Sequence, residues 1–159
     1  MWISIQQETT LDQPLAEEVV RLAFENAEHT NHREYLLVRE LRKTSSFIPE
    51  LSLVAVADTK IVGYIMFSQI SVEENETKHI ALALAPLAVI PEYQQGGIGT
   101  KLIETGHEKS ERLGYDACIV LGSNKYYSRF GYQEAKTFGI YAPFQVNSEN
   151  YMVKELTGC

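Results

Sequence analysis

The chain has 159 residues, of which 45% are hydrophobic and 22% are charged, which is typical of one soluble globular domain spanning residues 1–159. The net charge is −7, from 21 acidic and 14 basic side chains, and there is no basic stripe, so we expect no nucleic-acid partner. The sequence contains no apolar run of membrane-spanning length and no signal-peptide pattern at its start, so we expect a cytoplasmic protein without a membrane partner.

The cysteines and histidines form neither a disulfide framework nor a metal-ligand motif. Cys118 lies inside an apolar strand pattern, where we expect a small buried side chain, and Cys159 is the last residue. The four histidines show no ligand spacing to the cysteines or to one another; they are His29, His32, His79 and His107. We therefore expect no metal site.

Alternating apolar and polar residues at 2–7 predict a short N-terminal strand. Residues 9–27 have apolar residues at helical spacing and predict a helix, with Asp12 as a cap and Leu15 among the inward positions. Pro14 fits the first turn of that helix because its missing N–H would have no intrahelical partner there.

A second helix is predicted at 32–44, where Leu37 and Leu41 share a face. Pro49 is expected to close the connection that follows. Beyond it, β-branched and aromatic residues on both sides of a polar tip at 58–60 predict a strand hairpin.

Residues 79–90 are too apolar for a surface strand and therefore predict a central one. Pro86 within this run cannot donate a ladder hydrogen bond, so we expect a bulge or a place where pairing to one neighbour lapses. From Gly97 the pattern becomes helical, with Leu113 among the inward positions and Gly114 ending the helix.

The rest of the chain predicts a short helix, which Ser123 or Asn124 caps and Gly131 ends, and three strands. The strands are expected at 116–121, 138–144 and 150–156. The order β-α-α-β-β-β-α-β-α-β-β predicts an α+β or mixed α/β fold.

A loop rich in glycine and glutamine, "PEYQQGGIGTKL" at 91–102, separates the central strand from the helix after it. Such a loop is either a tight turn or a cradle for a ligand that contacts the backbone, since a helix start exposes unpaired N–H groups that bind phosphate. It is not a Walker loop, because Thr100 precedes Lys101 in the wrong order. It is not a dinucleotide fingerprint either, because Leu102 stands where the third glycine belongs.

Central strand, proline, loop and helix together resemble the GNAT superfamily of acetyl-CoA-dependent N-acetyltransferases. The family's phosphate loop reads Gln/Arg-x-x-Gly-x-Gly/Ala, which Gln94, Gly97 and Gly99 match. The resemblance implies a single domain with a mixed, mostly antiparallel sheet flanked by helices, and acetyl-CoA as cosubstrate. This context favours the ligand cradle over the tight turn.

The resemblance also implies where acetyl-CoA binds. Backbone N–H groups of the loop would hold the pyrophosphate, and the backbone of the central strand after Pro86 would pair with pantetheine as an added strand. A backbone N–H near Val89 would polarise the thioester carbonyl. The implied cosubstrate contacts are Leu87, Ala88, Val89, Gln94, Gln95, Gly96, Gly97, Ile98, Gly99, Thr100 and Asn124.

A second family element is "VLGSNKYYSRFGY", which matches the family's Tyr-x-Arg/Lys-x-Gly-Phe/Tyr ending. Tyr127 matches the position at which the family carries its general acid, and a phenol with a pKa of ~10 is protonated at neutral pH. The alternative is a core aromatic side chain whose hydroxyl has a backbone partner, and Tyr126 takes the catalytic role if the register shifts by one residue. Arg129 is expected to be a surface or phosphate-facing cation.

These features predict direct transfer of acetyl from acetyl-CoA to a primary amine of an unidentified acceptor, a small molecule rather than a protein. The alternatives are a catalytically silent CoA-binding regulatory or interaction module, and an acyltransferase acting on a protein or an aminoacyl-tRNA. The sequence does not decide whether the protein forms a homodimer. The general base is unassigned, because a solvated strand end explains each of the polar residues before the central strand: Glu73, Glu74, Glu76 and His79.

Overall fold

The computed structural model describes residues 2–27, 32–74 and 76–156. Its strands are β1 (Ile3–Gln7), β2 (Phe47–Ala57), β3 (Lys60–Glu74), β4 (Thr77–Val89), β5 (Ala117–Leu121), β6 (Gln133–Glu134) and β7 (Tyr151–Glu155). Its α-helices are α1 (Gln13–Phe24), α2 (Glu34–Leu41), α3 (Ile98–Arg112) and α4 (Asn124–Tyr127). Short 3₁₀ helices lie at Thr10–Asp12, Pro91–Tyr93, Ser128–Phe130, Ala135–Phe138 and Ser148–Asn150.

The strands form one sheet in the order β1-β2-β3-β4-β5-β7-β6. Strands β4 and β5 are parallel, whereas β1–β2, β2–β3, β5–β7 and β6–β7 are antiparallel. The predicted α+β fold with a mixed, mostly antiparallel sheet is therefore confirmed, as is the central position of β4.

Two compact units make up the chain. The first comprises Met1–Ser68 and Ala85–Lys109, and the second comprises Gln69–Leu84 and Ser110–Cys159. Strands β3 and β4 and helix α3 contribute residues to both. The single domain expected at 1–159 stays a prediction.

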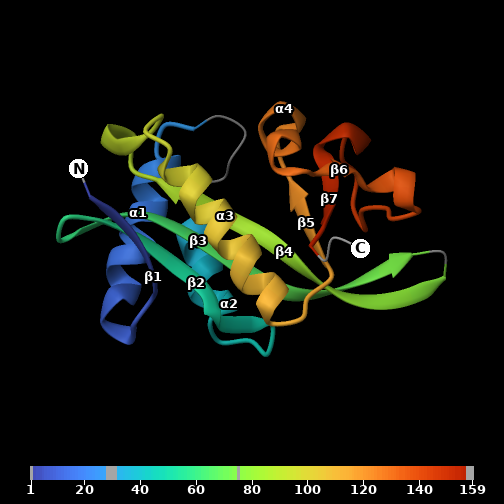
Figure 1. Ribbon diagram of the computed structural model, residues 1–159, viewed down its shortest axis with the longest axis horizontal. Helices are drawn as coiled ribbons and strands as arrows, with labels where there is room; N and C mark the ends of the chain where they lie inside the picture. Colours follow the sequence, from blue (N-terminus) through green and yellow to red (C-terminus); the bar gives the residue numbers. More distant parts are fainter. Residues whose placement is uncertain (1, 28–31, 75, 157–159) are drawn as a thin grey trace. The chain divides into compact units, whose positions relative to one another are not determined.

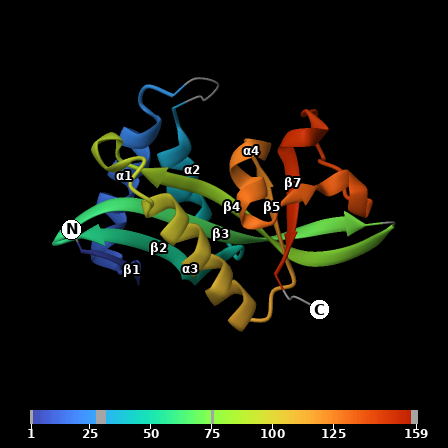
Figure 2. The same cartoon turned by 45° about the horizontal axis from the view of Figure 1, so that its top comes forward.

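In the first unit, helices cover both faces of the sheet. Figure 1 and Figure 2 show α1 and α2 on one face of β1, β2 and β3, and α3 on the other. Helix α3 lies close to β3 because Gly106 has no side chain: a Cβ there would be 2.2 Å from Cε1 of Phe67. The described residues include no helix long and apolar enough to cross a membrane.

The second unit has a small apolar core around β5, which pairs with β4 on one side and β7 on the other. The core residues come from four strands and from the segment between β6 and β7, and they are Val72, Ala81, Ile119, Ala135, Ile140 and Val153.

Three expected inward leucines are exposed: Leu15 to 56%, Leu37 to 50% and Leu113 to 45%. Helix α1 instead buries Ala16, Val19 and Val20, and α2 buries Val38. The predicted positions Val19, Ile98 and Leu102 are buried as expected, whereas the leucines at 15 and 37 border the buried stripe and smaller residues fill it.

Two predictions about the ends of elements were wrong, one at the start of α1 and one at the start of β2. The cap before α1 is a capping box in which Thr9 and Asp12 each accept a hydrogen bond from the other's backbone N–H, so Asp12 does not cap α1 with its own side chain. Pro49 lies inside β2, beside a register shift between Phe47 and Ser52 that accommodates its missing donor.

The strand expected at 138–144 was also wrong, and β6 was missed. A 3₁₀ helix ends at Gly139, whose φ of 77° is left-handed, and irregular backbone follows it. Strand β6 has only two residues, Gln133 and Glu134, and forms through pairing with β7, so the local pattern carries no signal for it.

Candidate active site

The loop predicted to hold phosphate connects β4 to α3 within the first unit. The 3₁₀ turn Pro91–Tyr93 leads into a segment where Gln95 has a φ of 66° and Gly97 a φ of 84°. Helix α3 then begins at Ile98, and Lys101 N–H donates to the Gly97 carbonyl oxygen at 3.1 Å. The first N–H groups of the helix therefore point out of its N-terminus, where the helix dipole is positive.

The space over this loop is open. A Cβ built on Gly97 meets no atom of the protein within 4 Å, and one on Gly96 meets only the Tyr93 carbonyl oxygen, at 3.6 Å. Gln95, Gly96 and Gly97 are exposed, whereas the side chain of Ile98 is buried and anchors the helix start. Ile98 can thus contact a ligand only through its backbone.

Gln94 has a structural contact that the sequence did not predict. Its side-chain Nε2 donates to the Val89 carbonyl oxygen at 2.9 Å, and its backbone N–H donates to the Pro91 carbonyl oxygen at 3.3 Å. These bonds join the loop to the end of β4. A contact between Gln94 and the cosubstrate stays a prediction.

Strand β4 carries the other predicted backbone contacts of the first unit. Leu87 and Val89 are half-buried, and the side chain of Ala88 is buried. Ile90 N–H donates to the Val62 carbonyl oxygen at 3.0 Å, which ties this end of β4 to β3.

In the second unit, the described pairing between β4 and β5 covers Leu82 and Ala83, which lie opposite Cys118 and Ile119. Strand β4 continues beyond these pairs to Val89. The described pairs between the two strands therefore lie in the part of β4 that belongs to the second unit, and the lapse of pairing expected at Pro86 stays a prediction.

Tyr127 is held by the turn between β5 and α4. Ser123 caps α4, with its hydroxyl accepting from Tyr126 N–H, and its carbonyl oxygen accepts from Tyr127 N–H at 3.0 Å. The Tyr127 ring packs over Gly122, where a Cβ would be 2.6 Å from its Cε2, and forms an edge contact with the ring of Tyr132 at 5.7 Å.

The two adjacent tyrosines have different surroundings. The Tyr127 hydroxyl has no hydrogen-bond partner within residues 2–27, 32–74 and 76–156. Burial, and then the nearby Tyr126 and Cys118, raise the pKa of Tyr127, so its proton stays bound at neutral pH. Tyr126 is half-buried, and the Arg129 guanidinium lies 4.8 Å from its ring centroid.

The other predicted residues of this unit are placed as follows. Asn124 begins α4 and is half-buried. Cys118 is fully buried, as expected, and burial raises the pKa of its thiol to about 12, so it is not a reactive thiolate. Glu73, Glu76 and His79 are exposed, while the side chain of Glu74 lies outside the described residues, as do His29 and Cys159.

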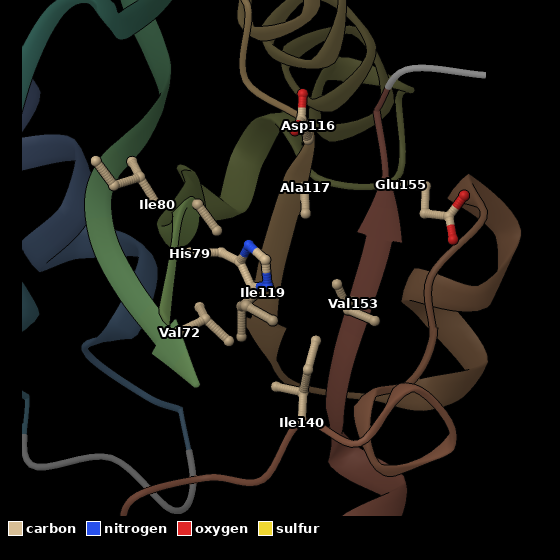
Figure 3. A pocket seen from close by; sticks show the side chains of 10 residues that line it. Val72, His79, Ile80, Asp116, Ala117, Ile119, Ile140, Val153 and Glu155 are labelled. Carbon is tan, nitrogen blue, oxygen red and sulfur yellow. The ribbon is translucent and has the colours of Figure 1, made fainter. Parts of the chain in front are cut away.

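A cavity of about 340 Å³ lies within the same unit, on the face of β5 that carries Ala117 and Ile119. The sequence did not predict this cavity. Figure 3 shows the side chains of Val72, Ile119, Ile140 and Val153 converging on it. The residues come from positions far apart in the chain, so no local pattern reveals the cavity.

Gly122 was also missed, although a glycine directly after an apolar strand is a signal of close packing. In the part of the chain that the structure describes, no three His, Cys, Asp or Glu residues gather as metal ligands.

Residues 49–134 match the acetyltransferase (GNAT) domain family. The chain is 38% identical over 129 residues to the uncharacterized N-acetyltransferase YjhQ of Escherichia coli (strain K12), covering 79% of this chain and 71% of that protein. The chain therefore belongs to the GNAT family of N-acetyltransferases, and the predicted family and enzyme class are confirmed.

Two solved structures are similar to nearly the whole chain. A GNAT family acetyltransferase from Brucella melitensis in complex with acetyl-CoA is 30% identical, with 95% of each chain covered and a TM-score of 0.76. The Escherichia coli acetyltransferase YhbS in complex with CoA is 28% identical, with 98% of this chain and 82% of that chain covered and a TM-score of 0.85. GNAT enzymes use acetyl-CoA as their cosubstrate, in agreement with the sequence expectation.

Proposed function

We propose that this protein transfers the acetyl group of acetyl-CoA directly to a primary amine in a ternary complex. The amine nitrogen attacks the thioester carbonyl carbon, the C–S bond breaks, and the thiolate takes a proton to become free CoA. The amine loses one proton to water or to a base that is not assigned. A small-molecule acceptor, a homodimer and a cytoplasmic location stay predictions from the sequence.

The loop before α3 supports binding of the CoA pyrophosphate. Its proposed contacts are the backbone N–H groups of Gln95–Thr100, where the dipole of α3 and aligned amides favour an anion without a lysine. Gln94 would hold the loop in place through the hydrogen bond from its side-chain Nε2 to the Val89 carbonyl oxygen. The pantetheine contacts at Leu87, Ala88 and Val89, the oxyanion role of the Val89 N–H and the contact at Asn124 rest on the family resemblance.

Tyr127 is the proposed general acid. Its hydroxyl has no partner among the described residues, which supports a role in donating a proton rather than in holding the core. Burial raises the pKa of this phenol, and it would also raise the pKa of a CoA thiol formed beside it. The phenol could therefore still give its proton to the thiolate.

The observation that carries the proposal is the exposed loop that ends at the N-terminus of α3, and Gly97→Asp tests it. The new carboxylate would stand where the pyrophosphate binds, and hydrogen bonds to charged groups contribute roughly 1.5–3 kcal/mol each, so the affinity for CoA should fall by about 100-fold. Calorimetric titration with CoA measures it.

Gly114→Asp is the matched control. Gly114 also has a left-handed φ, of 92°, and also has no atom within 4 Å of a built Cβ, so both variants carry the same backbone strain. We expect both variants to lose a similar amount of thermal stability. Only Gly97→Asp should also lose affinity for CoA. Unchanged affinity in Gly97→Asp would contradict the phosphate site.

A catalytically silent CoA-binding module is the alternative function. A panel of primary amines, with released CoA as the readout, distinguishes the two. Release of CoA that depends on an amine supports the enzyme, whereas CoA binding without release for any amine supports the module.

A further inference from the structure

The cavity in the second unit has the character of a binding site for an apolar group. Its volume of about 340 Å³ lies within the range of small-molecule sites. The walls are aliphatic side chains of β3, β4, β5 and β7 together with Ile140, and the imidazole of His79 is the polar group that faces inward (Figure 3). The carboxylates of Asp116 and Glu155 lie at the rim and turn away from the centre in the same view. The interior therefore fits a hydrocarbon body better than a charged one.

An apolar surface continues from the cavity along β5. Alternate side chains of a strand share a face, so Ala117 and Ile119, which line the cavity, lie on the same face as Leu121. Leu121 is 50% exposed, which is unusual for a leucine on a central strand. It directly precedes Gly122, on which the Tyr127 ring packs. The path from Ile119 to Gly122 is about 10 Å long at roughly 3.3 Å per residue.

Tyr127 and the cavity belong to opposite faces of β5. Cys118 and Val120 point away from Ile119 in the strand alternation, and Cys118 lies near enough to Tyr127 to affect its pKa, so the Tyr127 ring is on the Cys118 side. This arrangement suits the reaction, because the amine and the sulfur are bonded to the same carbonyl carbon in different directions. The amine would come from the cavity face of β5, and the sulfur would leave on the Tyr127 face. An acceptor can therefore approach along the Leu121 face while the phenol serves the leaving group.

We propose that this cavity binds the body of the acceptor, and that the acceptor class is a primary amine on an extended apolar chain of about 10 Å. This inference rests on the proposed acetyl transfer with Tyr127 as acid. It adds the cavity as the site that selects the amine.

The test measures kcat/KM of the full chain with saturating acetyl-CoA and n-alkylamines from ethylamine to octylamine. Each methylene that enters the cavity should raise kcat/KM by about fourfold. Ala117→Phe fills the cavity and should flatten this series. Ala142→Phe makes the same change at another half-buried alanine, which lines a smaller cavity beyond the shared wall residue Ile140, and should keep the series steep.

Two results would overturn the inference: a flat series in the unmodified chain, or an equally steep series in Ala117→Phe. Should Ala117→Phe not fold, Ile140→Ala enlarges the cavity and should move the best substrate to a longer amine; an unchanged optimum contradicts the site. Failure of the proposed function looks different, since CoA would then not be released with any amine, whatever its length.

Discussion

At the scale of single residues, the two adjacent tyrosines of α4 differ in what surrounds their hydroxyls. Tyr127 is packed between Gly122 and Tyr132, and its hydroxyl has no partner among the described residues. Tyr126 faces Arg129. The sequence predicted Tyr127 and left Tyr126 as the alternative in a register shifted by one residue, and these surroundings favour Tyr127 as the proton donor.

Tyr127→Phe should lower kcat by roughly 10²–10⁴, the usual effect of a positioned proton donor, because it removes the hydroxyl and keeps the ring. The affinity for acetyl-CoA should hardly change. Turnover under saturating acetyl-CoA measures the effect, and Tyr126→Phe is the control, which should remain close to full activity. A slow Tyr126→Phe enzyme beside a fast Tyr127→Phe enzyme would move the role to Tyr126.

Gly122 is a positioning residue, because the Tyr127 ring occupies the space of its missing side chain. Its φ lies outside the left-handed region, so the backbone alone does not require glycine. Gly122→Ala should displace the ring and lower kcat by roughly 10-fold or more, since a shift of about 1 Å can cost 10²-fold.

The double variant Gly122→Ala with Tyr127→Phe separates positioning from general damage. If Gly122 acts through Tyr127, the double variant should be no slower than Tyr127→Phe alone, because the effects of residues that act as a unit are not additive. Losses of kcat that multiply would contradict this role.

At the scale of elements, a buried ion cluster joins the helices of the first unit to its strands. Arg42 at the end of α2 pairs with Glu8, which follows β1, and with Glu17 of α1, and its side chain is 7% exposed. The hydroxyl of Ser52 donates to Glu8 at 2.7 Å and contacts the hydroxyl of Tyr64. This cluster fixes α2 against α1 and β2.

Arg42→Met should lower the free energy of unfolding by about 3–5 kcal/mol, because it leaves buried carboxylates without their partner. Arg39→Met is the control: Arg39 also pairs with Glu17, but its side chain is 52% exposed, so the loss should stay below about 1 kcal/mol. Urea unfolding measures both. Equal losses in the two variants would show that the buried pairs contribute no more than the exposed one.

At the scale of the whole molecule, the net charge of −7 acts on the two substrates in opposite directions. A cationic amine is attracted to an acidic protein and anionic acetyl-CoA is repelled, and salt screens both effects, with a Debye length of about 10 Å at 0.1 M. Raising the salt concentration from about 0.05 to 0.5 M should therefore lower kcat/KM for the amine a few-fold. The same change should leave kcat/KM for acetyl-CoA equal or higher. A parallel fall for both substrates would indicate general inhibition by salt instead.

Local chemistry in the sequence was sufficient to predict several features of this protein. The turn after β2, the start of α3 next to Gly97 and the end of the short helix at Gly131 all depend on backbone angles and caps within a few residues, and each was found where expected. The family was also predicted, because its phosphate loop and its tyrosine ending are continuous stretches of chain.

Tertiary structure alone decided which side of α1 and of α2 is buried, which tyrosine packs on Gly122 and where the cavity lies. Leu15 and Leu37 have the right spacing for a core, yet neighbouring smaller residues fill it. The cavity unites Val72, Ile119 and Val153, which are far apart in sequence. The turn after β2, the start of α3 and the end of the short helix are satisfied by atoms of the same segment, and so they could be predicted from the sequence. Burial and cavity shape depend on side chains brought together only by the sheet, and so they cannot.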